Sequence, residues 1–332
     1  MDRIKDVMDE VVVSEKLAAA REYEMKNKIA ANDRPLFHVT PAVGWMNDPN
    51  GFSVYAGRVH LFYQYHPYST VWGPMHWGHQ VTKDMIKWEQ LPAALAPDTE
   101  YDEDGCFSGT AIEDKGRHIL IYTSVMKNPD GEGVLQNQSI AVGDGTEYTK
   151  IGGNPVVNGD MLPYGLSRED FRDPKVWQED GIYYMVAGTV DEDKKGQVVL
   201  FSSQDIVNWN FESILARIDK DYGGVWECPD FFEIDGHKVL LVSPIEMVAK
   251  GYEFHNGNNS IYFIGDYDDT EKKFEVGEPF SLDYGTDFYA PQTTLLPDGR
   301  RVMIAWMQSW HNLWIPQGQM WQGMMTLPRE IS

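Results

Sequence analysis

Three acidic residues stand in short phrases that each contain a proline and lie far apart in the chain. Asp48 occurs in WMNDPNG, Asp173 in FRDPKV and Glu227 in WECPDF. Carboxyl groups can act as nucleophile, general acid or general base when two or more of them face the same bound molecule. An aspartate before a proline is also a common turn former, so each aspartate taken alone could have a purely structural role. Whether these acids form a site depends on the fold that positions them.

Five segments share one pattern, in which a short turn with a glycine precedes a strongly apolar run. They are YAGRVHLFYQ, EDKGRHILIYTS, QEDGIYYMVAG, EIDGHKVLLVSP and PDGRRVMIAWM, with turn glycines Gly57, Gly116, Gly181, Gly236 and Gly299. A tight hairpin needs the positive φ that glycine supplies. The intervals of 59, 65, 55 and 63 residues leave room for about four short strands each. The sequence therefore predicts an all-β fold, a five-bladed β-propeller of four-stranded antiparallel blades, with a β-sandwich as the alternative.

Polar residues recur at one place in this repeat. Counting back eight to ten residues from each turn glycine gives Asp48, Ser108, Asp173, Glu227 and Tyr289. The first strand of a propeller blade lines the axis, so this place becomes a ring at one mouth of the channel. Gln64 and Trp306 follow their glycines by seven residues, and antiparallel pairing returns them to the same mouth. Acids gathered with Arg172, an amide and aromatic rings favour glycoside chemistry, in which one carboxyl group is nucleophile or base and another is acid.

The first thirty residues have a different pattern. Ile4, Val7, Met8, Val11 and Val12 fall at helical spacing in a segment rich in Lys, Glu and Ala, which predicts a helix over residues 3–30. Short alternating strands begin after Pro35. We therefore divide the chain into an N-terminal helical appendage, residues 1–33, and a propeller catalytic domain, residues 34–332.

The composition excludes several classes of partner. The chain of 332 residues carries 28 Lys and Arg against 51 Asp and Glu, a formal net charge of −23, which repels nucleic acid and anionic membranes. It has no run of 18 apolar residues, and its first residues, MDRIKDVMDEVVVSEK, lack the basic and apolar regions of a signal peptide. We expect a cytoplasmic protein without contact to nucleic acid or membrane.

Metal and disulfide chemistry are not indicated either. The two cysteines, Cys106 and Cys228, are too few to hold a domain of this size together. Several histidines occur in strand-like runs, namely His60, His66, His76 and His79, without a cysteine pair or an HExxH helix beside them. We predict no metal site and no cofactor.

Taken together and in order, these motifs resemble glycoside hydrolase family 32, the invertases and fructan hydrolases. The resemblance rests on WMNDPNG, FRDP and ECPD at these intervals, supported by FYQY, WGPMHWGH, FSG and DFYA, and it extends from about residue 35 to the end. It implies a retaining β-fructofuranosidase that cleaves sucrose, sucrose 6-phosphate or short fructo-oligosaccharides by double displacement. Asp48 would be the nucleophile, Glu227 the general acid and base, and Asp173 the stabiliser of the transition state.

The same resemblance implies which side chains hold the fructose ring. They are Asn47, Gln64, Trp72, Phe107, Ser108, Arg172, Tyr289 and Trp306. Retention of configuration would require the carboxyl groups of Asp48 and Glu227 to lie roughly 5 to 5.5 Å apart.

The chain departs from the family in one respect. Family members usually continue into a C-terminal β-sandwich, whereas this sequence stops where that domain would begin, at Leu327-Pro328-Arg329-Glu330-Ile331-Ser332. Either the chain is a propeller-only form or a fragment, or the sandwich comes from elsewhere. We expect an exposed apolar flank that the N-terminal helix or a second copy of the chain would cover, so a homo-oligomer is one expected partner.

Two other functions fit the same residues. A fructosyltransferase would pass the covalent intermediate to a sugar instead of water, and a non-catalytic propeller would bind fructosides without cleaving them. Product analysis at high sucrose would separate the first from a hydrolase, and release of fructose would exclude the second.

Overall fold

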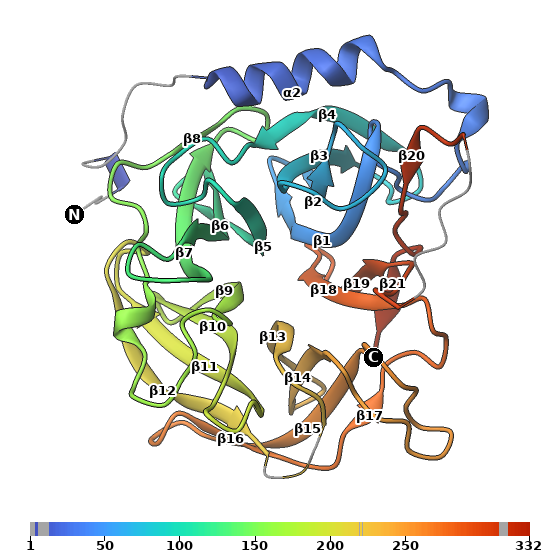
Figure 1. Ribbon diagram of the computed structural model, residues 1–332. Helices are drawn as coiled ribbons and strands as arrows, with labels where there is room; N and C mark the ends of the chain where they lie inside the picture. The colour runs from blue at the N-terminus through green and yellow to red at the C-terminus, as the bar shows by residue number, and fades with distance from the viewer. Residues whose placement is uncertain (1–3, 6–12, 219, 221, 312–317) are drawn as a thin grey trace.

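Five sheets stand around a central axis in the computed structural model, which describes residues 4–5, 13–218, 220, 222–311 and 318–332 (Figure 1). The first sheet contains β1 (Gly44–Tyr55), β2 (Arg58–His66), β3 (His76–Thr82) and β4 (Trp88–Leu95). The second contains β5 (Gly105–Asp114), β6 (Arg117–Lys127), β7 (Val134–Gly143) and β8 (Tyr148–Lys150). The third contains β9 (Arg172–Glu179), β10 (Ile182–Val190), β11 (Gly196–Ser203) and β12 (Trp209–Arg217).

The last two sheets complete the ring. The fourth contains β13 (Trp226–Ile234), β14 (His237–Pro244), β15 (Ile261–Asp268), β16 (Lys273–Val276) and the short β17 (Phe280–Ser281). The fifth contains β18 (Tyr289–Leu295), β19 (Arg301–Trp306) and β21 (Arg329–Ile331). The innermost strands β1, β5, β9, β13 and β18 contact one another in a closed circle, which confirms the five-bladed propeller.

The strand count per blade differs from four in two places. A short strand near the chain's end, β20 (Trp321–Gln322), pairs parallel to β1 and adds a fifth strand to the first blade. The fifth blade has three strands among the described residues. Both differences involve the last segment of the chain, which returns to β1 and so joins the two ends of the ring.

The predicted hairpin turns are confirmed by the backbone. All five turn glycines have φ between +73° and +89°. In four of them the loop has two residues, and the residue before the glycine is also left-handed: Ala56, Lys115, Asp180 and Asp235. Two consecutive positive φ values define a type I′ turn, whose twist matches that of the strands it joins. The fifth turn is longer, because Leu296 and Arg300 are hydrogen-bonded around it.

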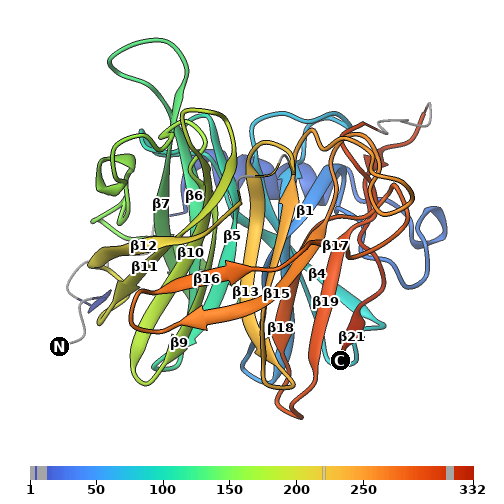
Figure 2. The same cartoon turned by 90° about the horizontal axis from the view of Figure 1, so that it is seen from below.

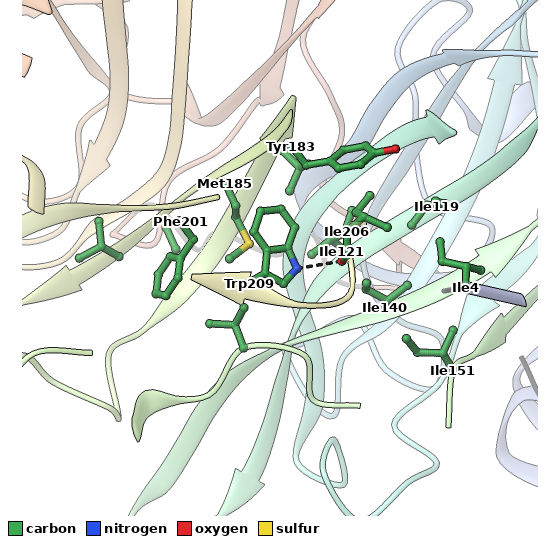
Figure 3. Close-up of a cluster of buried hydrophobic side chains, with 14 of the residues drawn as sticks. Ile4, Ile119, Ile121, Ile140, Ile151, Tyr183, Met185, Phe201, Ile206 and Trp209 are labelled. Carbon is green, nitrogen blue, oxygen red and sulfur yellow. Dashed lines mark hydrogen bonds between the residues drawn. The ribbon is translucent and has the colours of Figure 1, made fainter. Parts of the chain in front are cut away.

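Apolar side chains fill the space between neighbouring blades. Between the second and third blades, Ile119 and Ile121 of β6 pack against Met185 of β10 and Phe201 of β11 (Figure 3). Trp209 closes this cluster and donates its indole N–H to the backbone oxygen of Ile206, 2.8 Å away. Such clusters fix the angle between blades and therefore the shape of the ring.

The N-terminal helix is shorter than predicted. Helix α2 spans Glu15–Lys26: the hydroxyl of Ser14 caps its first turn, and Asn27 ends it by donating its backbone and side-chain N–H groups to the oxygen of Tyr23. It lies along the outside of the first blade against β4 (Figure 1). Ile4 is buried in the cluster between the second and third blades. Of the residues that predicted a helix over 3–30, the others, Val7, Met8, Val11 and Val12, lie outside the described residues.

The two ends of the propeller differ in the loops they carry. Figure 2 shows the hairpin turns after β9 and β18 at one end, and the long loop between β6 and β7 at the opposite end. No helix in the described part of the chain is long and apolar enough to span a bilayer.

Candidate active site

Each innermost strand is interrupted by a β-bulge at the end opposite its hairpin turn. In every blade, two residues of the first strand lie opposite one residue of the second strand: 47–48, 107–108, 173–174, 228–229 and 290–291. A bulge bends its strand and redirects the side chains beside it. The polar residues that recur in the sequence lie in these five bulges or directly before them.

Three of the bulges contain a residue in a left-handed conformation that precedes a proline. Asp173 has φ +65°, Cys228 has φ +48° and Ala290 has φ +51°. This conformation is uncommon for residues other than glycine, and such strained residues occur most often at functional sites. The repeated strain indicates that this end of the ring is shaped to direct side chains rather than to extend the sheets.

Asp48 of β1 is held in the first bulge by neutral donors. The amide of Asn47 donates to its Oδ1 at 3.0 Å, and the hydroxyl of Ser108 on β5 donates to its Oδ2 at 3.0 Å. The thiol of Cys228 lies 3.7 Å from the same Oδ2. Since Asp48 is only 9% exposed, its position is fixed by three neighbouring residues.

Asp173 of β9 is joined to the neighbouring blades. Its Oδ2 accepts the backbone N–H of Cys228 at 3.0 Å and lies 3.6 Å from that residue's thiol. Its own backbone N–H donates to the hydroxyl of Thr123 on β6 at 2.8 Å. The Cys228 thiol therefore lies between the carboxylates of Asp48 and Asp173.

Glu227 of β13 is positioned by one cation and one phenol. The Nε of Arg172 donates to its Oε1 at 3.0 Å, and the hydroxyl of Tyr289 donates to its Oε2 at 2.5 Å. Arg172 also contacts Asp170 at 3.2 Å and the side-chain oxygen of Gln136 at 3.4 Å. One guanidinium therefore links Glu227 to the rim of the site.

A cavity of about 560 Å³ opens above these bulges. It is lined by nine of the residues predicted for the site: Asn47, Asp48, Gln64, Trp72, Phe107, Ser108, Arg172, Asp173 and Glu227. The rings of Trp72 and Phe107 meet edge to face with centroids 6.1 Å apart. The predicted gathering of three carboxylates around one cleft is therefore present in the structure, with aromatic rings beside it.

Two predicted binding residues do not line this cavity. Tyr289 and Trp306 are fully buried behind it. Tyr289 reaches the site through its hydrogen bond to Glu227. Trp310 lines the cavity, and its ring meets that of Trp306 with centroids 5.1 Å apart.

Burial governs the electrostatics of the site. Burial and then the charge of Glu227 raise the pKa of Asp48 to about 6, against the opposite effect of the hydrogen bonds from Asn47 and Ser108. Burial and the charge of Glu227 likewise raise the pKa of Asp173, against the effect of Arg172. The cleft therefore disfavours the ionised forms of Asp48 and Asp173.

This arrangement is that of a known family. A model of the glycosyl hydrolases family 32 N-terminal domain matches residues 38–332. The chain belongs to glycoside hydrolase family 32.

Curated relatives of this family 32 chain include two from Escherichia coli. A sucrose-6-phosphate hydrolase is 42% identical over 305 residues, covering 90% of this chain and 62% of that protein. A raffinose invertase is 41% identical over 303 residues, with coverages of 90% and 62%. The chain therefore spans about three fifths of the length of these relatives.

Solved structures support the same assignment. A family 32 β-fructofuranosidase of Bombyx mori, as a variant in complex with sucrose, aligns with a TM-score of 0.87 and 39% identity. The alignment covers 96% of this chain and 68% of that one.

Several residues that line the family 32 cleft were not predicted from the sequence. The cavity is also lined by Gly133, Val134, Gln136, Glu169, Asp170 and Trp310. Glu169 and Asp170 stand directly before the FRDP motif, so the acidic run SRED was a signal for them. Gln136 and Val134 lie at the start of β7, where nothing in the repeat distinguishes them.

The histidines noted in the sequence lie in the first blade, and none of the described histidines lines the cavity. His60 and His79 are buried side by side in the first blade, with ring nitrogens 3.0 Å apart. Both cysteines are free and buried. Among the described residues, no group of three or more His, Cys, Asp or Glu side chains could hold a metal ion.

Proposed function

We propose that this chain is the catalytic part of a retaining β-fructofuranosidase, which releases fructose from β-fructofuranosides by hydrolysing an O-glycosyl bond. The observation that carries this proposal is the meeting of Asp48, Asp173 and Glu227 in one cavity, on three blades of a family 32 propeller. Two carboxyl groups flanking a glycosidic bond are the usual means of cleaving it.

The environments of the carboxylates support a division of roles. Asp48 accepts hydrogen bonds from neutral donors and has no cation paired with it among the described contacts, so its charge is available to attack the anomeric carbon. Glu227, on β13 of the fourth blade, would protonate the leaving oxygen and then take a proton from the water that resolves the intermediate.

Asp173 would stabilise the transition state. Its carboxylate accepts a backbone N–H and lies beside the Cys228 thiol, so it is oriented before any sugar binds. The positive charge that develops on the fructosyl ring in the transition state would be stabilised by this fixed negative group. The sugar ring would be held by Asn47, Gln64, Trp72, Phe107, Ser108 and Arg172. The buried side chains of Tyr289 and Trp306 would support the site from behind.

The substrate range is proposed from the relatives' printed names and from the cleft. Those names refer to sucrose 6-phosphate, raffinose and levan, which share a terminal β-fructosyl unit. The measurement is release of free fructose from sucrose, sucrose 6-phosphate, kestose and inulin by the purified chain. Absence of release from all four would refute the proposed function.

The stereochemistry provides a separate test of the mechanism. Time-resolved NMR in the first seconds of the reaction distinguishes the β-anomer of fructofuranose, expected from two successive displacements, from the α-anomer. An α-anomer formed first would rule out a nucleophilic Asp48. Cytoplasmic location and homo-oligomerisation stay predictions, which cell fractionation and analytical ultracentrifugation would test.

A further inference from the structure

A buried ionic cluster joins three inner strands just below the site. Lys175 of β9 follows Asp173 by two residues, and Asp230 of β13 follows Glu227 by three. The ammonium of Lys175 lies 3.1 Å from Oδ2 of Asp230 and donates to the backbone oxygen of Thr293 on β18 at 2.6 Å. The three strands that carry Asp173, Glu227 and Tyr289 thus meet at one point on the axis.

The carboxylate of Asp230 receives its other partners from the third strand. The backbone N–H and the hydroxyl of Thr293 donate to Asp230 Oδ2 at 2.8 and 2.9 Å. Arg301 of β19 donates to the same hydroxyl at 2.9 Å, with its guanidinium 4.3 Å from the ring centre of Phe232. The contact between Arg301 and Thr293 lies within the fifth blade, but the other contacts cross from one blade to another, whereas the backbone ladders of the described strands run within single blades.

This cluster is an expensive way to stabilise a core. The side chains of Lys175 and Asp230 are 12% and 2% exposed, and burial lowers the pKa of Lys175 while the charge of Asp230 opposes that shift. Replacing a buried ion pair by well-packed apolar residues is often neutral or stabilising. Hydrogen bonds to charged groups add a specific geometry to a contact, which apolar packing defines less sharply, and this geometry can fix how far one strand is displaced along another.

The direction matters because the site depends on contacts between the same strands. The Asp173 carboxylate is held by a backbone N–H of β13, and Glu227 is held by Arg172 of β9 and Tyr289 of β18. A slide of β9 against β13 would lengthen these contacts together. Misplacing catalytic groups by about 1 Å can cost a factor of about 100 in rate.

We propose that Lys175 is a positioning residue, which acts through Asp230 and Thr293 to hold Asp173 and Glu227 in register across the axis. This inference rests on the proposed function, since it assigns Lys175 a role in the same reaction. A positioning role and a purely structural role predict different values of kcat for a Lys175 variant whose stability has been restored by a second substitution.

The test begins with Lys175→Met, which keeps the length of the side chain and removes the charge. We expect kcat for the best fructoside to fall about tenfold to a hundredfold with KM changed less than about twofold, because rate is more sensitive to alignment than binding is. Lys238→Met is the matched control: this lysine lines the same cavity of about 740 Å³ at the hairpin end but pairs with the more exposed Glu233. The control should leave kcat unchanged, and a kcat for Lys175→Met equal to that of the control would overturn the proposal.

A double variant separates alignment from stability. Lys175→Met leaves the carboxylate of Asp230 without its cation, so its melting temperature should fall. Lys175→Met combined with Asp230→Leu removes both charges and should recover much of the melting temperature while kcat stays low. Recovery of kcat together with the melting temperature would make the cluster structural only and refute its positioning role.

A crystal structure of Lys175→Met keeps this inference separate from the proposed function. If the wild-type chain releases no fructose, the proposed function fails, but the coordinates still report on positioning. We expect the contact between Asp173 and the Cys228 N–H, or that between Arg172 and Glu227, to be longer or lost. Both contacts unchanged in the variant would count against the role of Lys175 whatever the activity.

Discussion

The two ends of the inner strands follow different structural rules. At the hairpin end, four of the five blades share the same two-residue turn, with consecutive left-handed residues and open space around the glycine. At the other end every strand contains a bulge, but the residues in it differ from blade to blade. Repetition marks the part of the propeller that builds the scaffold, and variation within a common bulge marks the part that holds the candidate site.

The ionisable groups of the two ends differ in the same sense. Near the hairpin end, the charge of Asp230 is matched by Lys175 and by two donors from Thr293. At the bulge end, Asp48 has only neutral donors, and its pKa is raised. In the scaffold, the buried charge of Asp230 has a cation beside it. In the cleft, the charge of Asp48 has none among the described contacts, which is unfavourable for stability but useful for reaction.

The largest effect on turnover is expected from replacing Glu227, the proposed general acid and base. Glu227→Gln keeps the shape of the side chain and one of its two acceptor oxygens but cannot transfer a proton, so kcat should fall about 10²- to 10⁴-fold on sucrose while the melting temperature changes little. Steady-state kinetics and thermal unfolding measure the two effects. Asp160→Asn is the control, because that carboxylate is 74% exposed, pairs with Arg168 and does not line the cavity. A comparable loss in the control would contradict the assignment.

A smaller effect is expected from Asp173→Asn. Asparagine tolerates the left-handed conformation and can still accept the Cys228 N–H, so the fold should be preserved. Loss of the negative charge should lower kcat on the order of 10²-fold and change KM much less, because the group acts mainly on the transition state. Unchanged kcat would remove Asp173 from the mechanism.

The sequence predicts the scaffold well because the repeat is encoded locally. Turn glycines followed by apolar runs place all five hairpins, and their spacing predicts the number of blades. The bulges could not be placed in the same way, because a bulge is defined by the partner strand. Counting from the turn glycines puts Asp48 and Glu227 at the same position, although Asp48 lies inside its bulge and Glu227 lies just before one.

Burial explains what the sequence missed in the cleft. The resemblance to family 32 assigns Trp306 to the sugar, but the residue that lines the cavity is Trp310, four positions later and outside the strand. The linked contacts of Lys175, Asp230 and Thr293 are also invisible in sequence, since the three residues belong to different blades. Local pattern gives the elements, and the packing of blades decides which of their side chains reach the axis.

At the cleft end, the stability of the folded chain should depend on pH through Asp48. With a pKa of about 6 in the folded chain and 3.8 as its ordinary value, Asp48 binds a proton more tightly when folded. Its stabilising contribution is therefore complete below pH 3.8 and is lost as the pH rises through about 6. The difference in melting temperature, Asp48→Asn minus wild type, should grow between these values and stay constant above them. A difference independent of pH would mean that Asp48 carries no such burial cost.

The smallest effect is expected at the hairpin end, where a change should alter stability without altering chemistry. Gly116 has φ +77° with no atom near the position of an added Cβ, so Gly116→Ala meets only the intrinsic cost of a left-handed backbone, about 1 kcal/mol. Urea unfolding should show this loss, while kcat and KM remain at wild-type values. Lys115→Gly at the preceding position is the reciprocal control: its residue has φ +51°, so glycine there should not lower stability through strain. A fall in kcat for Gly116→Ala would show that the two ends are coupled and that the division between scaffold and cleft is wrong.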